Sequence, residues 1–391
     1  MKIAVPKEVA PGETRVALVP QDVARLVKAG ISVAVESGAG HAAGCADSDY
    51  TAKGATIETG VEPLLASVDV VVKVFAPIQH PTAGRHEVEL LREGSALIAH
   101  LSALGGLEDM GLLDRLNGRR ISALSLDCVP RITRAQSMDV LSSQATISGY
   151  KAVLMAADAL PKMLPMLMTA AGTLAAARVF VLGAGVAGLQ AIATAKRLGA
   201  VVEAFDTRAA VKEQVQSLGA RFVELELGHG DAQDKGGYAK ALSADQHQKE
   251  QELLARHVKD ADVVIATALV PGRKAPVLVT EDMVKSMRRG SVVVDLAAER
   301  GGNCACTEPG QVTVKHGVTI CGTLNLPALL PVHASQMFSR NVSTLVLDLH
   351  KDGALRLDRS DEVVAGALIT HNGETVHEAT RKRHAAPVGA S

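Results

Sequence analysis

The sequence predicts an α/β protein with two doubly wound parallel-sheet domains, and three observations support this fold class. Short apolar runs alternate with stretches of helical periodicity along most of the chain. The chain has 391 residues, which is more than one ordinary core accommodates and suits two domains. Its residues are 47% hydrophobic and include 35 glycines, a composition typical of buried strands joined by tight turns.

The first predicted sheet comes before the middle of the chain. Pro20–Ala29 has helical periodicity and is followed by Gly30, which can take the left-handed conformation that ends a helix. Strands are predicted on either side of this helix at the apolar runs Ile3–Val5, Ser32–Glu36, Val68–Val74 and Ala96–His100.

The second predicted sheet follows. Its strands are short and apolar, as buried parallel strands are, and are predicted at Val179–Leu182, Val201–Phe205, Asp262–Ala266, Ser291–Asp295 and Thr319–Gly322. A helical stretch near Asn325 then leaves this sheet, and we expect it to return to the first domain. One domain would comprise residues 1–140 and 326–391, and the other residues 141–325. The active cleft would then lie between them.

The C-terminal tail has a different pattern. Val363–Val376 resembles a hairpin that turns at Asn372-Gly373, a dipeptide that favours such turns. Arg381–Ser391 is basic and rich in alanine and proline, which predicts disorder.

A dinucleotide-binding fingerprint follows Val179–Leu182. In this motif one glycine makes the tight turn, the next lets the backbone approach a pyrophosphate, and the third allows a helix to pack closely on the strand. A helix over Val186–Leu198 would present its positive dipole end to the phosphates. Such glycines also occur in ordinary strand-to-helix turns, but the strand, turn, helix and strand together favour a Rossmann-like nucleotide site. The motif reads Gly183-Ala184-Gly185-Val186-Ala187-Gly188.

The next predicted strand, Val201–Phe205, is followed by Asp206, 18 positions after Gly188. Its carboxylate can accept hydrogen bonds from adenosine ribose hydroxyls and would repel a 2′-phosphate by an energy on the order of several kcal/mol. This favours NAD(H) over NADP(H), although Arg208 keeps the alternative open. With the strand exit after Ala266, the predicted cofactor-binding residues are Gly183, Gly185, Val186, Ala187, Gly188, Asp206, Thr207, Arg208, Thr267, Ala268 and Leu269.

Composition argues against several other functions. The net charge is −1 and tryptophan is absent, so nothing supports nucleic-acid binding. The 13 histidines show no paired metal spacing, and no metal is predicted. Hydride transfer between nicotinamide rings is consistent with the absence of such motifs, because it needs neither a general base nor a metal. We interpret the scattered cysteines as buried or idle thiols of a reducing compartment: Cys45, Cys128, Cys304, Cys306 and Cys321.

The most unusual polar segment is PRITRAQSMDVLSSQ, residues 130–144. A helix starting near Ser137 would place Gln136, Asp139 and Ser142 along one stripe. From composition alone this segment is a capped surface helix with a salt bridge to Arg131.

Several of these segments resemble the NAD(H)-binding component of proton-translocating transhydrogenase. They are residues 131–144, 183–199 and 206–219, and "DLAAERGGN" from Asp295. The resemblance runs from "PKEVAPGETRVALVP" at Pro6 to about Asn341. It implies a Re/Si-specific NAD(P)+ transhydrogenase, in which NAD(H) bound here exchanges a hydride directly with NADP(H) on a partner component. A membrane component would couple this to proton translocation. The resemblance also implies that the catalytic residues, on the nicotinamide side, are Arg131, Gln136, Asp139 and Ser142.

The same resemblance implies a mobile loop at Gly236-Gly237-Tyr238-Ala239, where Tyr238 would bind over the nucleotide as a lid. The alternative is a merely flexible surface insertion. The family further implies a homodimer that is cytoplasmic and held peripherally on the cytoplasmic face of the inner membrane by its partner subunits. Some relatives carry transmembrane helices on the same polypeptide. None follows Ser391 here, so we expect a separately encoded subunit.

An alanine dehydrogenase is the rival enzyme. That family shares Arg15, but its catalytic lysine corresponds here to Phe75 and its catalytic histidine to Ser102. A dehydrogenase acting on an amino acid must move a proton, so these losses remove acid–base help worth ~10²- to 10⁴-fold in rate. We interpret His100 as a buried structural histidine that points to the other strand face, and Arg15 as a structural remnant or a packing contact. A NAD-sensing module without turnover is a third alternative.

Overall fold

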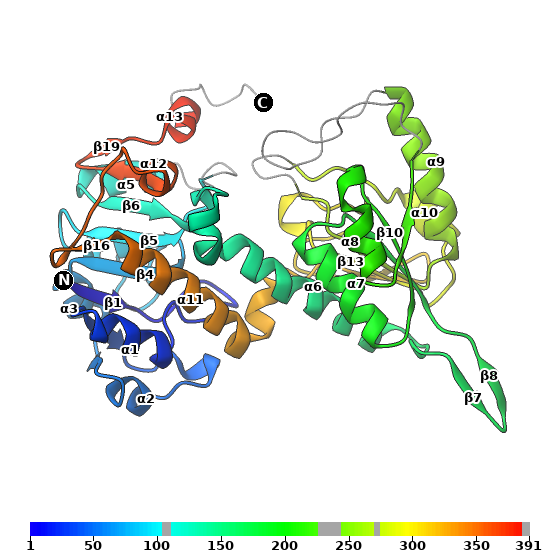
Figure 1. Ribbon diagram of the computed structural model, residues 1–391, viewed down its shortest axis with the longest axis horizontal. Coiled ribbons are helices and arrows are strands. Elements are labelled where there is room, and N and C mark those ends of the chain that lie inside the picture. Colours follow the sequence, from blue (N-terminus) through cyan, green and yellow to red (C-terminus); the bar gives the residue numbers. More distant parts are fainter. Residues whose placement is uncertain (104–110, 226–243, 270–273, 385–391) are drawn as a thin grey trace. The chain divides into compact units, whose positions relative to one another are not determined.

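The computed structural model describes residues 1–103, 111–225, 244–269 and 274–384 (Figure 1). The chain divides into two compact units: unit 1 contains Met1–Gln144 and Ala328–Ser391, and unit 2 contains Ala145–Pro327. Each unit has its own large, mainly parallel sheet flanked by helices. The predicted α/β class with doubly wound sheets is therefore confirmed.

Unit 1 is built on an eight-stranded sheet with the order β19-β18-β6-β5-β4-β1-β2-β3. The stretch from β6 to β3 is parallel and has the 3-2-1-4-5-6 order of dinucleotide-binding folds, whereas β18 and β19 are antiparallel. The strands are β1 (Lys2–Val5), β2 (Ser32–Glu36), β3 (Thr56–Glu58), β4 (Val70–Phe75), β5 (Ala96–His100), β6 (Ser122–Ser125), β18 (Leu368–His371) and β19 (Glu374–Thr375).

The helices of unit 1 come from both ends of the chain. They are α1 (Pro20–Lys28), α2 (Asp47–Thr51), α3 (Val61–Ala66), α4 (Glu87–Leu90), α5 (Gly111–Gly118), α11 (Pro331–Leu349), α12 (Glu362–Ala367) and α13 (Glu378–His384). Short 3-10 helices are η1 (His41–Ala43), η3 (Leu126–Cys128) and η4 (Thr133–Met138), and a small hairpin pairs β16 (His350–Lys351) with β17 (Ala354–Leu355).

Helix α11 anchors the C-terminal segment in the core of unit 1. Phe338 is buried in the same apolar cluster as residues of α1 and the sheet. The Ser335 hydroxyl accepts a hydrogen bond from the Val16 N–H at 3.0 Å, and the Ser339 hydroxyl accepts one from the Val19 N–H at 2.9 Å. These serines satisfy buried backbone donors ahead of α1, so a polar stripe can face the core at little cost.

Unit 2 is built on a seven-stranded sheet with the order β11-β10-β9-β12-β13-β15-β14, in which only β14 is antiparallel to its neighbour. The strands are β9 (Arg178–Leu182), β10 (Val201–Phe205), β11 (Arg221–Val223), β12 (Val263–Ala266), β13 (Val292–Asp295), β14 (Val312–Lys315) and β15 (Val318–Cys321). The helices of this unit are α7 (Val186–Arg197), α8 (Lys212–Ser217), α9 (Ala244–Asp260) and α10 (Glu281–Ser286), with 3-10 helices η5 (Ala209–Val211) and η6 (Ala298–Arg300).

Two further elements complete the chain. Helix α6 (Val140–Ala159) begins in unit 1 and runs into unit 2, and the 3-10 helix η7 (Leu326–Leu329) lies where unit 2 ends. A hairpin of β7 (Leu167–Thr169) and β8 (Gly172–Leu174) projects from unit 2 (Figure 1). Among the described residues, no helix is both long and apolar enough to cross a bilayer.

The tail differs from the predicted pattern. The turn at Asn372-Gly373 is confirmed, because both residues have positive φ and join β18 to β19. However, the first part of the predicted hairpin is helix α12, whose N-terminus is capped by Asp361: its carboxylate accepts from the Val363 N–H at 2.8 Å. The predicted disorder from Arg381 is also wrong as far as His384, which ends α13, and the remaining residues lie outside the described ranges.

The predicted strands match observed ones, but the predicted set is incomplete. It omits β3, β6, β11 and β14 in the large sheets. The helical stretch expected near Asn325 starts as the 3-10 helix η7 and continues as α11 from Pro331.

Candidate nucleotide-binding site

The fingerprint turn lies at the point where the order of the unit 2 sheet reverses. β9 has β10 on one side and β12 on the other, so chain segments leaving β9 and β12 diverge at the carboxyl edge of the sheet. Doubly wound folds bind ligands at such switch points. Gly183 follows β9 and Thr267 follows β12, and the Thr267 hydroxyl donates to the Gly183 carbonyl at 3.0 Å.

Each glycine of the turn has its own role. Gly183 has φ of +93°, which only glycine adopts readily. A methyl group added at Gly188 would overlap the Gly183 carbonyl oxygen, so the third glycine is needed for close packing of α7 on β9. A methyl group at Gly185 would meet no atom of the described residues within 4 Å. Open space therefore borders the backbone where a pyrophosphate would approach.

Helix α7 begins directly after this open space. Its N-cap is Gly185, which has no side chain to satisfy the first N–H groups of the helix, and Val186 and Ala187 follow in the first turn. Helix α6 packs against this turn, because a methyl group at Gly149 would overlap the Ala187 carbonyl oxygen. The role of Gly149 was missed from sequence, since a single glycine inside a helical pattern gives no indication of its neighbour.

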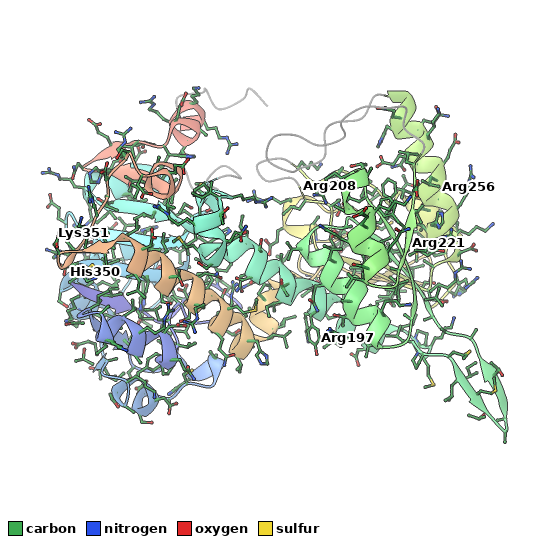
Figure 2. The ribbon with its side chains drawn as sticks, viewed as in Figure 1. Arg197, Arg208, Arg221, Arg256, His350 and Lys351 are labelled. Atoms are coloured by element: carbon green, nitrogen blue, oxygen red, sulfur yellow. The ribbon has the colours of Figure 1, made fainter. Side chains whose placement is uncertain are left out.

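Asp206 lies at the end of β10 with its side chain 6% exposed. Its carboxylate accepts hydrogen bonds from the Ala184 N–H and the Arg208 N–H, both at 2.8 Å. The Arg208 guanidinium, 19% exposed, also donates to it from Nε at 2.9 Å and from Nη2 at 2.7 Å (Figure 2). The acid predicted to bind a ribose is therefore part of a bidentate ion pair. Thr207, between the two, is half-buried.

The loop after β12 is held in place by hydrogen bonds to Asn303, which is fully buried. The Asn303 side chain accepts from the Ala268 N–H at 3.0 Å and donates to the carbonyl oxygens of Ala268 and Pro276, both at 2.8 Å. Leu269 is exposed at the end of this braced segment. No role for Asn303 was predicted from sequence, because its partners lie 27 and 35 positions away.

Asp295 holds the loop that carries Asn303. Its buried carboxylate accepts from the Ala297 N–H at 2.9 Å, the Cys304 N–H at 3.0 Å and the Thr307 hydroxyl at 2.7 Å. The ends of β9, β10, β12 and β13 thus supply one connected frame at the carboxyl edge of the sheet. Tyr238 and its neighbours 236–239 lie outside the described residues.

The polar stripe of unit 1 is not a single helix. The segment forms the 3-10 helix η4, breaks at Asp139 with ψ of 93°, and resumes as α6 at Val140. The break has a local cause: the Asp139 carboxylate accepts from the Ser142 N–H at 2.9 Å and from its hydroxyl at 2.6 Å, as an N-cap does. The structure therefore brings Asp139 and Ser142 together, whereas Gln136 lies exposed on η4 and Arg131 lies exposed before it. The helix expected to start near Ser137 is wrong.

Helix α11 and the start of α12 hold η4 in place. The Asn341 amide donates to the Ser137 carbonyl at 2.8 Å. Arg134 forms ion pairs with Asp361 at 2.5 Å and Asp348 at 3.6 Å. Sequence reasoning missed these contacts because they join segments about half the chain apart.

Phe75 and Ser102, the positions of the catalytic lysine and histidine in alanine dehydrogenases, lie at the carboxyl ends of β4 and β5. Arg15 donates to Glu13 through Nε at 2.8 Å and Nη2 at 2.7 Å, and its guanidinium carbon lies 5.2 Å from the centroid of the Phe75 ring. His100 packs edge-on against Phe75 with ring centroids 6.0 Å apart, and its Nδ1 lies 3.4 Å from the Ser102 hydroxyl. Arg15 is thus bound by an ion pair to Glu13 and packs on Phe75, which fits a structural role. His100, however, is half-buried and shares a side with Phe75, so its predicted orientation is wrong.

Lys73, two residues before Phe75, is fully enclosed. Its ammonium lies 2.5 Å from a Glu87 oxygen and 3.7 Å from a Glu8 oxygen. Burial opposes its charged form, but these carboxylates outweigh burial and raise the pKa of Lys73. Burial also raises the pKa of Glu8, with Lys73 acting in the opposite direction. A lysine held charged in this way cannot serve as a neutral base.

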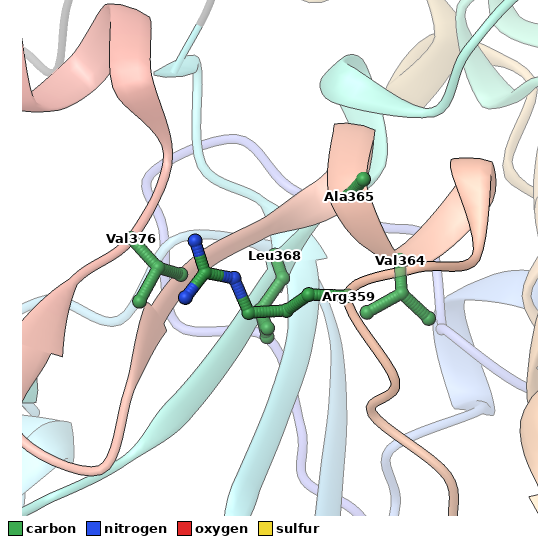
Figure 3. A pocket seen from close by; sticks show the side chains of 5 residues that line it. All are labelled: Arg359, Val364, Ala365, Leu368 and Val376. Carbon is green, nitrogen blue, oxygen red and sulfur yellow. The ribbon is translucent and has the colours of Figure 1, made fainter.

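Other features lie apart from this chemistry. A cavity of about 220 Å³ in unit 1 is lined by Arg359, Val364, Ala365, Leu368 and Val376, none of them a predicted site residue (Figure 3). Within the described ranges, no group of three or more histidine, cysteine or acidic side chains could hold a metal. The cysteines are free thiols, and burial raises the pKa of Cys304 to about 11, which keeps it unreactive.

Comparison with known proteins agrees with this geometry. The family model "Alanine dehydrogenase/PNT, N-terminal domain" matches residues 4–148, and "Alanine dehydrogenase/PNT, C-terminal domain" matches residues 152–378. An NAD(P) transhydrogenase alpha-subunit chain of Rhodospirillum rubrum is 47% identical over 382 residues, covering 97% of this chain and 98% of that protein.

A solved transhydrogenase structure from Sinorhizobium meliloti has a TM-score of 0.82 and 41% identity, covering 97% of this chain and all of that one. An alanine dehydrogenase from Halomonas elongata is more distant, at 31% identity over 391 residues, covering 97% of this chain and 95% of that protein. The chain belongs to the alanine dehydrogenase/PNT family and, within it, to the alpha subunits of NAD(P) transhydrogenase.

Proposed function

We propose that the chain is the NAD(H)-binding subunit of a proton-translocating NAD(P)+ transhydrogenase. It would exchange a hydride between NAD(H) bound at the unit 2 switch point and NADP(H) held on a partner component. The observation that carries this proposal is the glycine turn after β9. It combines open space at Gly185, an N-terminus of α7 without a side-chain cap, and an acid at the end of β10.

The residues of unit 2 fit a dinucleotide. The turn Gly183–Gly188 and the first turn of α7 would hold the pyrophosphate, and Asp206 the adenosine ribose. Thr267, Ala268 and Leu269 would line the same edge, positioned by Asn303. NADH should bind more tightly than NADPH, and Asp206→Ala should narrow the difference, as measured by calorimetry.

We further propose that Arg131, Gln136, Asp139 and Ser142 of unit 1 hold the nicotinamide ring and its carboxamide. Bound NADH supplies the hydride, and no proton moves with it, so the chain's task is positioning and exclusion of water. The Asp139–Ser142 pair suits this task because the Ser142 hydroxyl donates to the Asp139 carboxylate at 2.6 Å, which fixes both side chains at the N-terminus of α6. Tyr238 is proposed as part of a lid.

We propose that the chain works as a homodimer, together with an NADP(H)-binding component and a membrane component, on the cytoplasmic face of the inner membrane. The β7–β8 hairpin supports the homodimer. Residues 163–177 carry no charged side chain, and Met166 and Met168 are 62% and 72% exposed. A lone two-stranded hairpin is marginally stable in water, and such apolar surface usually contacts a second chain. Met168→Glu should shift the sedimentation equilibrium toward monomer.

The alanine dehydrogenase alternative is not favoured by the unit 1 geometry. Phe75 and Ser102 offer no amine or imidazole at the required positions, Lys73 is enclosed by carboxylates, and Arg15 is bound to Glu13. Purified protein should therefore consume no NADH with pyruvate and ammonia above background. Turnover within a hundredfold of a working alanine dehydrogenase would overturn the proposal.

One mixing experiment tests the proposed activity directly. The purified chain with NADH is mixed with a transhydrogenase NADP(H)-binding component loaded with NADP+, and NADPH formation is followed by stopped flow. Rapid formation supports the proposal. If both proteins bind their nucleotides and no hydride is exchanged, the proposal fails and a NAD-sensing module becomes the better explanation.

A further inference from the structure

We propose that Arg208 determines nucleotide specificity by competing with the ligand for Asp206. In the free protein, its guanidinium occupies the acceptor positions that the adenosine ribose would use, and it must leave when NAD(H) binds. This inference rests on the proposed function, because it takes the fingerprint of unit 2 as the NAD(H) site.

The hydrogen-bonding capacity of the Asp206 carboxylate is limited. Two carboxylate oxygens offer about four lone-pair positions. All of these have donors: the Ala184 N–H and Arg208 Nη2 on one oxygen, at 2.8 and 2.7 Å, and the Arg208 N–H and Nε on the other, at 2.8 and 2.9 Å. Ribose hydroxyls therefore find no vacant acceptor on Asp206 while this arrangement lasts.

The donors around Asp206 differ in whether they can leave. The Ala184 N–H belongs to the fingerprint turn, and the Arg208 N–H lies two residues after the carboxylate, so both are fixed by the backbone. The guanidinium lies at the end of a flexible side chain and is partly exposed to solvent. It can rotate away while the backbone donors keep the carboxylate aimed at the ligand. Only the two side-chain bonds are exchangeable for ribose bonds.

The ion pair also changes the charge at the site. The preference for NAD(H) predicted from sequence assumes an isolated Asp206, which repels a 2′-phosphate. The bidentate pair neutralises that charge, and the released guanidinium would stay near the ribose, where it can attract a 2′-phosphate. Arg208 thus weakens NADH binding and at the same time reduces discrimination against NADPH. Both effects follow from one side chain.

The strand offers a matched control. Arg221 pairs with Glu203, a carboxylate of β10 three residues before Asp206, at 3.4 Å and is 67% exposed (Figure 2). It belongs to no part of the proposed site. Methionine keeps the length of the arginine side chain without its donors or charge. Arg208→Met and Arg221→Met therefore each remove one guanidinium that pairs with a carboxylate. Arg208→Met removes it at Asp206, and Arg221→Met removes it at Glu203, outside the proposed site.

The experiment is calorimetric titration of wild type, Arg208→Met and Arg221→Met with NADH and with NADPH. A partly exposed ion pair shifts such an equilibrium by about fivefold. Arg208→Met should accordingly bind NADH about fivefold tighter and NADPH weaker, whereas Arg221→Met should stay within about twofold of wild type. Arg208→Lys, which keeps the charge but not the fork, should bind NADH with intermediate affinity and guards against a misfolded methionine variant.

The outcomes separate the two proposals. Wild type that binds neither nucleotide overturns the proposed function and this inference with it. Wild type that binds NADH, with Arg208→Met and Arg208→Lys binding it equally well or more weakly, overturns the inference alone. In that case the guanidinium either does not compete or contacts the nucleotide productively.

Discussion

Two glycine-to-alanine substitutions, one in the fingerprint and one in the helix that packs against it, should have opposite consequences, although the chemical change is the same. Gly149 lies inside α6, where alanine is about 1 kcal/mol better than glycine by helix propensity. Its added methyl group, however, would overlap the Ala187 backbone, which cannot rotate away as a side chain can. Overpacking of this kind costs up to about 3 kcal/mol. The net loss for Gly149→Ala is therefore about 2 kcal/mol.

Gly185→Ala should leave folding intact and damage binding. Gly185 has φ of −75°, which alanine adopts without strain, and within the described part of the chain its methyl group would meet no atom within 4 Å. Loss of a glycine from the unfolded chain adds about 0.4–1 kcal/mol of stability. The same methyl group enters the space proposed for the pyrophosphate. We expect NADH affinity to fall at least tenfold, which corresponds to about one hydrogen bond to a charged group.

Scanning calorimetry and NADH titration on the same samples test this pair. For a unit of this size, about 2 kcal/mol lowers Tm by about 4–8 °C. Gly149→Ala should show that loss in the unit 2 transition, and Gly185→Ala should melt at or slightly above the wild-type temperature. Unchanged melting of Gly149→Ala would refute the packing argument, and wild-type NADH affinity in Gly185→Ala would refute the placement of the pyrophosphate.

Three further predictions concern positioning, packing and pH. Asp139→Asn and Gln136→Asn should each cut hydride transfer to an NADP-loaded partner at least tenfold, since a 1 Å displacement of the nicotinamide ring can slow transfer about a hundredfold. NADH affinity should change only a few-fold. Wild-type transfer rates in both variants would mean that these residues form only a polar surface. Asn303→Ala leaves buried backbone groups at Ala268 and Pro276 unpaired, so Tm should fall by several degrees, whereas unchanged melting would show that water replaces the amide. The pKa of Asp262 is lowered: burial raises it, but the hydrogen bonds from Lys162 and the Arg178 N–H outweigh burial. Its stabilisation is present above the ordinary value of 3.8 and is lost as pH falls through the lowered pKa. Asp262→Asn should therefore melt below wild type at pH 7, with a difference that shrinks in acid; a constant difference would contradict this.

Strands were predicted well where burial and hydrophobicity coincide. β2, β5 and β10 have the predicted bounds, because strands covered on both faces are mostly apolar. β6 was missed although it is buried, because Ser122 and Ser125 interrupt its apolar pattern. Ser122 bonds to His371 and Ser125 to Asp127, so the polar groups are satisfied by partners that a local pattern does not reveal.

Local chemistry also determined the turns. Gly183 and Gly188 could be assigned from sequence because a strand, a turn and a helix must meet within a few residues, and Asn372-Gly373 could be assigned because positive φ favours those residue types. The cap formed by Asp139 was missed, although its partner is three residues away. An aspartate fits both a helical stripe and an N-cap. The outcome depends on η4, which is held in place by Asn341 and ends just before Asp139.

The electrostatic state of the site was decided only by tertiary structure. The sequence by itself determined that an acid follows the second strand of unit 2 and that an arginine lies two residues later, but not that they pair. That pairing depends on where the Ala184 N–H fixes the carboxylate, which in turn depends on β9 and β10 being neighbours in register. The role of Asn303 also required the tertiary structure, because its amide links three segments separated along the chain. Hydrogen bonds depend on distances of a few ångströms, and only the folded chain brings residues that are far apart in sequence to such distances.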